Sequence, residues 1–282
     1  MSTLPFLGSF CRECYSSPAE VYEKLKRSGM DLVTVTDHDS IGAADSLQPH
    51  PDFFLSEEVT CRMPSGTQAH LGVYDIDARQ HVGIQARRDD LPRLLGYLSE
   101  QKILFSLNHA FSNLTGRRDP QDFEWFSARF PLLEVMNGHL HPENNRLAGE
   151  LAQSRQRGAI AGSDGHTLLS AGSAFTEVPG ARNKEEFIQG LRSGQARLHG
   201  APGNYWKLTR DALLIALECL KERPALSLLA PLILAIPAFT LLNQVREVEF
   251  VRRYGRYATH PGERRVGACM TPGPLGSAEV AT

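Results

Sequence analysis

Short apolar runs alternate with amphipathic stretches from about residue 16 to residue 200 of this 282-residue chain. The runs are rich in β-branched and aromatic residues and end in polar or turn residues, which is typical of strands. Seven strands are predicted, at 31–36, 53–60, 70–76, 103–108, 132–136, 159–162 and 175–178. Between several of them leucines recur at helical spacing, as at positions 91, 94, 95 and 98. The alternation predicts βα units around a largely parallel sheet, and hence an α/β fold class.

Two of the predicted helices have clear boundaries. The residues Ser-Pro-Ala-Glu at 17–20 form a capping box with proline at the first helical position, and Gly29 is a suitable stop. Asn183 predicts the start of a later helix, in which Phe187 and Leu191 share a face. Helices of this kind fit between the strands of an α/β domain.

The pattern changes after Gly203. A helix is predicted at Lys207–Leu220, and the 21 residues Pro224–Gln244 carry no charge. A stretch of that length could just span a bilayer. Pro231 and Pro237 lie inside it, and each removes a helix hydrogen bond, which weakens the case for a membrane helix. A membrane-embedded segment and a buried helical hairpin are both open at this point.

Composition divides the chain and narrows its function classes. We expect an α/β domain at 1–202, an apolar helical region at 203–250 and a disordered tail rich in glycine, proline and arginine at 251–282. The 30 basic and 32 acidic residues nearly cancel, so no stable nucleic-acid partner is indicated. The five scattered cysteines do not suggest a disulfide framework, and no secretory signal is seen. A cytoplasmic protein is expected, with membrane association only through Pro224–Gln244.

Histidines and carboxylates recur at or near the ends of the predicted strands. They lie in five segments, which are Thr36–Asp39, Ser56–Thr60, His70, Asn108–His109 and Gly162–His166. The carboxyl ends of parallel strands meet on one face of a sheet or barrel, so side chains there become neighbours. Imidazoles with carboxylates suit Zn²⁺, Mn²⁺ or Fe²⁺, and a shared carboxylate can bridge two ions. The five segments together predict a metal centre.

Six segments resemble those of the PHP (polymerase and histidinol phosphatase) domain family of metal-dependent phosphoesterases. In chain order, within residues 16–200, they are TDHDS, EEVT, AHLGVYDID, LNHAF, EVMNG and GSDGH. The resemblance implies a distorted seven-stranded (β/α) barrel that binds up to three divalent metal ions. It also implies that the protein hydrolyses phosphomonoesters or phosphodiesters.

The resemblance further implies which side chains bind metal. The six implied ligands are His38, Glu58, His70, His109, Asp164 and His166. Glu58 would bridge two ions, and one of these would be completed by His70 and His109. Asp164 would reach the other bridged ion. Glu58, His109 and Asp164 are the residues expected to act in catalysis.

The remaining assignments concern the outer ion and two further residues. His38 and His166 would bind the outer ion. Glu57 is the alternative to Glu58 because the two acids are adjacent. Asn137 either lines the pocket or is a turn residue before Gly138.

One part of the family pattern is missing. PHP domains open with a strand that ends in His-x-His, and here no histidine precedes the capping box at 17–20. The barrel would then lack its first strand, which leaves an unpaired sheet edge. Three explanations stay open. The natural start lies upstream of Met1, which we favour, or the motif is lost, or other residues replace it, with His139-x-His141 and Cys11-x-x-Cys14 as candidates.

The function predicted on this basis is metal-dependent hydrolysis of a phosphoester by Mn²⁺, Zn²⁺ or Fe²⁺. The near-zero net charge favours a small phosphomonoester or a nucleotide-type substrate over a long polynucleotide. The alternative is a degenerate, non-catalytic metal-binding module or a membrane-associated scaffold. Both hypotheses use the same ligands, so the sequence does not separate them.

Overall fold

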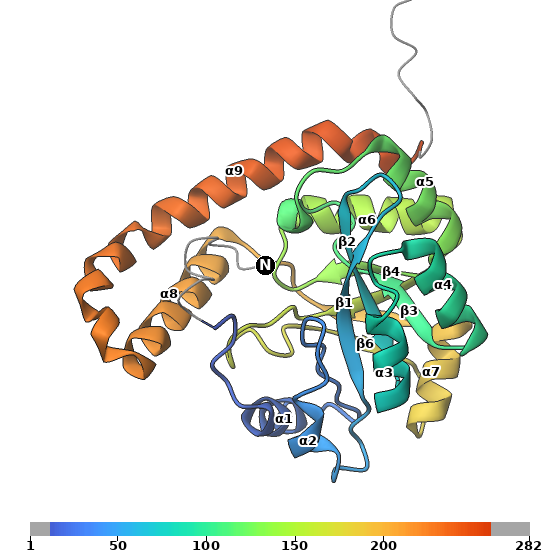
Figure 1. The fold of residues 1–282 in the computed structure, drawn as a ribbon, viewed down its shortest axis with the longest axis horizontal. Coiled ribbons are helices and arrows are strands. Elements are labelled where there is room, and N and C mark those ends of the chain that lie inside the picture. Colours follow the sequence, from blue (N-terminus) through green and yellow to red (C-terminus); the bar gives the residue numbers. More distant parts are fainter. Residues whose placement is uncertain (1–11, 261–282) are drawn as a thin grey trace, which may run out of the picture.

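The computed structural model describes residues 12–260 and has an α/β architecture (Figure 1). Five strands form one sheet in the order β1-β2-β3-β4-β5, and β6 and β7 form a separate two-stranded sheet. The strands are β1 (Ser56–Arg62), β2 (Gln68–Tyr74), β3 (Leu104–Leu107), β4 (Leu132–Asn137), β5 (Gly158–Gly162), β6 (Ala174–Glu177) and β7 (Arg197–Gly200). Within residues 12–260 the strands do not close on themselves, so the expected seven-stranded barrel is not formed.

Helices surround the sheet and continue beyond it. The α-helices are α1 (Pro18–Arg27), α2 (Ala44–Leu47), α3 (Ala78–Gln85), α4 (Leu91–Glu100), α5 (Pro120–Arg129), α6 (Pro142–Ser154), α7 (Lys184–Arg192), α8 (Tyr205–Glu222) and α9 (Ile236–Tyr254). Three 3₁₀ segments are η1 (Asn113–Thr115), η2 (Pro224–Ala235) and η3 (Gly255–Ala258). The predicted capping box is present at Ser17, and Asn183 caps α7 as expected.

The first half of the sheet differs from the prediction of a largely parallel sheet. β1, β2 and β3 pair antiparallel, and only β3, β4 and β5 are parallel. The link between β1 and β2 is the five residues 63–67. A parallel crossover needs about a dozen residues or more, so this link permits only a hairpin. The parallel pairs are joined by stretches that hold α5 and α6.

The strand predicted at 31–36 is not an element of either sheet. Two isolated parallel bridges hold this part of the chain, one between Val33 and Phe53 and one between His38 and Glu58. The Val33 N–H donates to the Asp52 carbonyl at 2.9 Å. The β-type sequence of this segment therefore makes two separate bridges in place of a regular strand.

The main hydrophobic core lies between β1–β3 and helices α4, α5 and α6, and the end of the described chain belongs to it. Phe250, Tyr254 and Tyr257 are buried in this core. The Tyr257 ring stacks on Phe123 with centroids 5.0 Å apart and planes inclined by 10°. The predicted disordered tail is therefore wrong for residues 251–258, because aromatic packing orders them. Its remaining residues, 261–282, lie outside the described part of the chain.

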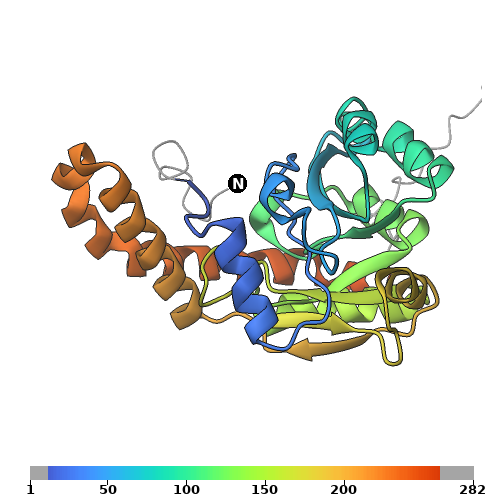
Figure 2. The same ribbon diagram turned by 90° about the horizontal axis from the view of Figure 1, so that it is seen from below.

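The apolar segment Pro224–Gln244 is divided between two elements. It forms η2 and the first half of α9, and together with α8 it makes a helical arm (residues 205–245) that projects from the α/β body (Figure 2). None of the helices described between residues 12 and 260 is long and apolar enough to cross a membrane. The buried hairpin is wrong in part, because Leu228 is 89% and Leu234 is 85% exposed.

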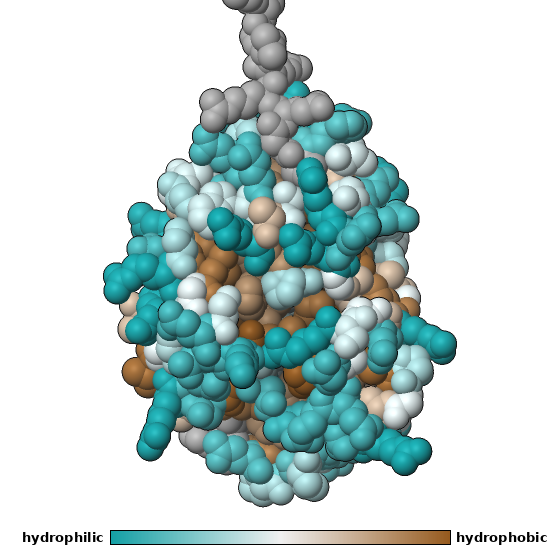
Figure 3. All heavy atoms as spheres, turned by 90° about the vertical axis from the view of Figure 1, so that its right-hand side faces the viewer, coloured by the Kyte–Doolittle hydropathy of each residue, from teal (hydrophilic) through white to brown (hydrophobic). Residues whose placement is uncertain are grey.

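Surface and cysteine chemistry add two details. On the side of the molecule turned away from the arm, hydrophilic residues cover much of the surface and apolar ones show between them (Figure 3).

Cys14 and Cys61 are free thiols, whereas Cys219 on α8 is disulfide-bonded. The scattered cysteine spacing did not indicate this bond.

Candidate metal centre

Strand geometry turns Glu57 and Glu58 in opposite directions. Successive side chains of a strand point to opposite faces of the sheet, and both acids lie in β1. Glu57 is fully buried, and its Oε2 accepts hydrogen bonds from His81 Nδ1 and Gln85 Nε2, both at 2.9 Å. Glu58 points toward the histidines of β2 and of the loop after β3. Glu57 is therefore excluded as the alternative to Glu58 at the histidine cluster.

Glu58, His70 and His109 form a tight buried cluster. The Glu58 Oε1 atom lies 3.6 Å from His70 Nδ1 and 3.3 Å from His109 Nε2. The two imidazole nitrogens are 3.1 Å apart. Ligand atoms at about 2.0–2.2 Å from one tetrahedral ion are separated by roughly 3.3–3.6 Å. The spacing of the three atoms fits a single divalent ion between them.

His38 approaches the same carboxylate from its other oxygen. Its Nε2 atom lies 3.4 Å from Glu58 Oε2, and its ring is 4.7 Å from that of His70. His38, Glu58 and His70 form a group whose ligand atoms all lie within 4.8 Å of one another. Because the two oxygens of Glu58 face different histidines, this carboxylate is positioned to bridge two ions.

Glu13 is a neighbour of this group that the sequence did not reveal. Its Oε2 atom lies 4.0 Å from His38 Nε2. In the sequence, Glu13 is only an acid shortly before the capping box at 17–20. It is 25 positions from His38, and no local pattern relates two residues that far apart. The structure therefore adds one carboxylate to the side of the centre that His38 occupies.

Asp164 and His166 lie together after β5. His166 Nδ1 donates to the Asp164 carbonyl at 3.0 Å, and Asn137 Nδ2 donates to Asp164 Oδ2 at 3.2 Å. Burial by itself would raise the pKa of Asp164, but the charges of His166 and His139 outweigh it and leave the pKa lowered. Both residues line the cavity that His38, Glu58 and His109 also line. The pair therefore faces the cluster across one cavity.

The two histidines of His139-x-His141 make different contacts. The His139 ring centre lies 5.6 Å from that of His166, and both of its nitrogens are buried without a hydrogen-bond partner. His141 caps α6, where its Nδ1 accepts from the Glu143 N–H at 3.5 Å. The motif therefore does not act as a pair of neighbouring ligands. The other candidate motif includes Cys11, which lies outside the described residues.

The side chains of Glu58, His70 and His109 change one another's pKa values. Burial disfavours the Glu58 carboxylate, but hydrogen bonds and charge from His109 and His70 lower its pKa well below the usual range. Burial likewise disfavours a charged His109, yet the adjacent Glu58 raises the pKa of His109 above its ordinary value. An ion that binds here must displace a proton from an imidazole, so its affinity rises with pH.

Glu134 connects the cluster to Asp164 and was missed from the sequence. It lies in β4 and is buried, and its Oε2 accepts from the His109 N–H at 3.0 Å and from Asn137 Nδ2 at 3.0 Å. Burial raises the pKa of Glu134 to about 7. The Asn137 amide touches Glu134 and Asp164, and its Oδ1 accepts from the His139 N–H at 2.8 Å. Asn137 thus both lines the site and shapes the turn after β4.

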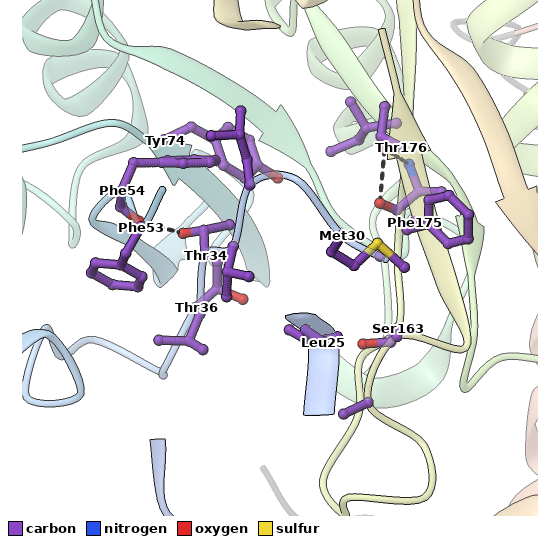
Figure 4. Close-up of a pocket in the computed structure, with 18 of the residues that line it drawn as sticks. Leu25, Met30, Thr34, Thr36, Phe53, Phe54, Tyr74, Ser163, Phe175 and Thr176 are labelled. Atoms are coloured by element: carbon purple, nitrogen blue, oxygen red, sulfur yellow. Dashed lines mark hydrogen bonds between the residues drawn. The ribbon is translucent and has the colours of Figure 1, made fainter. Parts of the chain in front are cut away.

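The cavity that these residues share is large enough for a small substrate. Its volume is about 1060 Å³. Figure 4 shows Thr34 and Thr36 on one wall and Phe175 and Thr176 on the other, with Met30 between them. Substrate pockets in proteins commonly combine such apolar walls with a few convergent polar groups. The metal-type ligands are the convergent groups here.

Comparisons with known proteins find relatives of this fold. A family model described as PHP-associated matches residues 142–196. A crystal structure of a two-domain protein from Bacteroides vulgatus, containing a predicted PHP-like metal-dependent phosphoesterase, covers 71% of this chain at 15% identity with a TM-score of 0.54. These matches support a PHP-type assignment over residues 142–196 and a shared fold beyond them.

A second solved structure shares the fold at a similarly low identity. The crystal structure of PsfC from Pseudomonas syringae covers 74% of the chain at 16% identity, with a TM-score of 0.53, and the match spans 93% of PsfC. The match spans 65% of the Bacteroides vulgatus protein. No curated protein matches the sequence. At such identities the likeness to these structures establishes the fold and leaves the reaction to be argued from the site.

Proposed function

We propose that this PHP-domain protein is a metal-dependent phosphoesterase. The observation that carries the proposal is the spacing of 3.1–3.6 Å among the ligand atoms of Glu58, His70 and His109. The second oxygen of Glu58 would serve a second ion, and His38 lies 3.4 Å from that oxygen, on the side proposed for a third. Pairs of ions that share a carboxylate are a common arrangement in enzymes that cleave phosphoesters.

The residues fall into three groups in this proposal. Glu58 holds two ions together, one of them completed by His70 and His109. Asp164 serves the second ion. His38, His166 and Glu13 would hold a third, with Mn²⁺, Zn²⁺ and Fe²⁺ as the metals that these donors suit.

Each part of the chain has a separate task in the reaction. When bound, the ions supply Lewis-acid polarisation of the phosphoryl group and lower the pKa of an attacking water. Glu58 stays ionised because His70 and His109 stabilise its charge. His38 and His166 are each about 30% exposed and would hold the outer ion beside the cavity, where its charge would stabilise the leaving oxygen.

The substrate proposed is a small phosphomonoester or a nucleotide. The cavity is bounded on several sides, and the chain has a formal net charge of -2. A long polynucleotide would need a basic track of lysine and arginine along its backbone. A compact phosphoester needs only the metal centre and the apolar walls.

A non-catalytic metal-binding module is the second candidate, and one observation favours it. The assignment gives the ion near Asp164 only two protein ligands, Asp164 and Glu58. Catalytic ions usually have three or more. This module would bind metal at the Glu58 cluster and show no turnover.

One experiment separates the two candidates. The purified protein is given Mn²⁺ or Zn²⁺ and assayed on p-nitrophenyl phosphate and bis(p-nitrophenyl) phosphate, with metal content measured in parallel. His109→Ala is expected to lose both metal and activity, while His260→Ala, at an exposed histidine after η3, keeps both. Metal binding without turnover would favour the module. Unchanged metal content in His109→Ala would overturn the phosphoesterase proposal.

A further inference from the structure

The loop after His109 is fixed by two buried carboxylates from different parts of the chain. Glu134 of β4 accepts from the His109 N–H at the start of the loop. Glu247 of α9 accepts hydrogen bonds from Ser112 and Asn113 at the end of the loop. It lies more than 130 residues further along the sequence. Glu247 is only 6% exposed. The loop that carries a candidate metal ligand is thus held by a helix outside the α/β alternation.

The side-chain hydrogen bonds of Glu247 go to this loop and to Asn144 of α6, which is itself bonded to the loop. Its Oε1 accepts from the Ser112 hydroxyl at 3.1 Å and from the Asn113 N–H at 3.0 Å. Its Oε2 accepts from Asn144 Nδ2 at 2.7 Å, and the same Nδ2 donates to the Phe111 carbonyl at 2.7 Å. Residues 111–113 are therefore bonded directly or through one amide to a single carboxylate.

Apolar side chains of α9 pack on the main core, and that packing does not involve the Glu247 carboxylate. Phe250 and Tyr254 are buried in the main core, and the Tyr254 hydroxyl donates to the Arg118 carbonyl at 2.8 Å. A buried charge is expensive to desolvate, and apolar side chains of similar size often stabilise a fold as well or better. The position of Glu247 is therefore better explained by what it holds than by the docking of the helix.

His109 itself needs to be held. Its φ is +32°, in the left-handed region that residues with a β-carbon rarely adopt. Such a conformation persists only where surrounding contacts impose it. The Ser112 N–H donates to the His109 carbonyl at 3.0 Å, which links the residue directly to the part of the loop that Glu247 fixes.

We infer that Glu247 is a positioning residue, which keeps His109 in ligand geometry by fixing the loop 109–113 from helix α9. This inference rests on the proposed function for the role of His109 as a ligand. It extends that function by making the C-terminal helix a part of the metal centre. Groups that orient metal ligands from outside typically contribute 10–100-fold to metal affinity.

The test compares two glutamates on the same helix. Glu247→Gln keeps the size of the side chain but turns one acceptor into a donor that faces Asn144 Nδ2. Glu249→Gln changes an exposed carboxylate two positions away and is the matched control. Co²⁺ is titrated as the probe, and its visible absorption reports the geometry of its ligands. Hydrogen–deuterium exchange of the 109–113 segment is measured in the metal-free protein.

Glu247→Gln is expected to weaken Co²⁺ binding about tenfold, to change the Co²⁺ spectrum and to speed exchange at 109–113. Glu249→Gln is expected to match the wild type in all three. Wild-type affinity and exchange in a folded Glu247→Gln variant would overturn the inference. If that variant does not fold, Ser112→Ala decides. It removes the hydroxyl that donates to Glu247 and accepts from the Leu114 N–H, and it leaves α9 unchanged. A Co²⁺ affinity equal to wild type would then overturn the inference.

The two proposals fail in different ways. If the wild type binds no Co²⁺ and no Mn²⁺, the proposed metal centre is lost. Exchange at 109–113 still reports whether Glu247 holds the loop, because that measurement needs no metal. If the wild type binds Co²⁺ and Glu247→Gln binds it equally well, only the positioning role is lost.

Discussion

Two groups of candidate ligands face the same cavity but are built differently. Glu58, His70 and His109 are in direct contact, and the two histidine side chains are 5% and 4% exposed. Asp164 and His166 are 21% and 30% exposed and are joined mainly through a backbone carbonyl. The first group comes from paired strands and a clamped loop, whereas the second follows the end of a single strand.

This difference indicates how much each group is organised before an ion arrives. In the Glu58 cluster the ligand atoms already have the separation that one ion requires, so little rearrangement accompanies binding. The Asp164 group has fewer contacts to fix it, and ordering its side chains costs part of the binding free energy. We therefore expect the Glu58 cluster to bind its ion first and more tightly.

The largest effect is expected from Glu58→Gln. This change removes the charge that the two proposed ions would share and weakens the pairing with His70 and His109. Loss of the bridging ligand should exceed the 10–100-fold that outlying residues contribute, so kcat/KM is expected to fall more than about 100-fold. Metal analysis and phosphatase kinetics measure it, with Glu57→Gln as the neighbour that points away. Equal losses in the two variants would contradict the assignment of Glu58.

A smaller effect is expected from His166→Ala. The variant should lose the weakest ion and keep the one at Glu58, with kcat/KM reduced on the order of 10-fold. Isothermal titration with Mn²⁺ should show the tight step unchanged and a later step missing. Loss of the tight step as well would mean that the two groups act as one site, which removes the distinction drawn above.

The pH dependence of stability tests Glu134, which joins the two groups. Its pKa is about 7 in the folded protein against 4.5 for the free side chain, so the folded state binds this proton more tightly. The free energy of unfolding of metal-free protein should therefore fall as pH rises from 4.5 to 7, by an amount on the order of 2–3 kcal/mol. Above pH 7 this contribution should be constant.

Urea unfolding at pH 5 and pH 8 measures this contribution. Glu134→Gln should remove that part of the pH dependence, and Glu124→Gln, an exposed acid on α5, should leave it in place. A wild-type slope that persists in Glu134→Gln would show that another group titrates.

The smallest effect is expected from His139→Phe. Both nitrogens of this ring are buried without a partner, and such groups cost about 1–3 kcal/mol when unsatisfied. An aromatic ring of similar size should keep the packing against His166, so thermal stability should be unchanged or slightly higher. Metal content should also be unchanged. A loss of metal as large as that of His166→Ala would identify His139 as a ligand instead.

Sequence patterns predicted the elements near the site well where the signals are local. The capping residues Ser17 and Asn183 lie at helix starts as predicted. Strands were predicted within a few residues of β1 to β6, because alternation and β-branched content depend only on neighbours. β7 was not predicted, and its four residues contain Arg197 and His199 with no apolar run.

The partners of Glu58 were harder to predict. Adjacent acids in one strand differ only in the face they occupy, and the register of β1 on β2 decides which one meets the histidines. Glu13, Glu134 and Glu247 carry no spacing signal that relates them to His38 or His109. Their roles arise from contacts between residues far apart in the chain.

By itself, the sequence indicated the α/β alternation, the resemblance to the PHP family and the six residues of ligand type, because these depend on composition and order along the chain. The tertiary structure decided that the first three strands run antiparallel, that residues 251–258 belong to the core and that α9 reaches the loop of His109. The physical reason is the same in each case. Pairing direction, burial and long-range hydrogen bonds depend on which surfaces meet after folding, and local patterns do not contain that information.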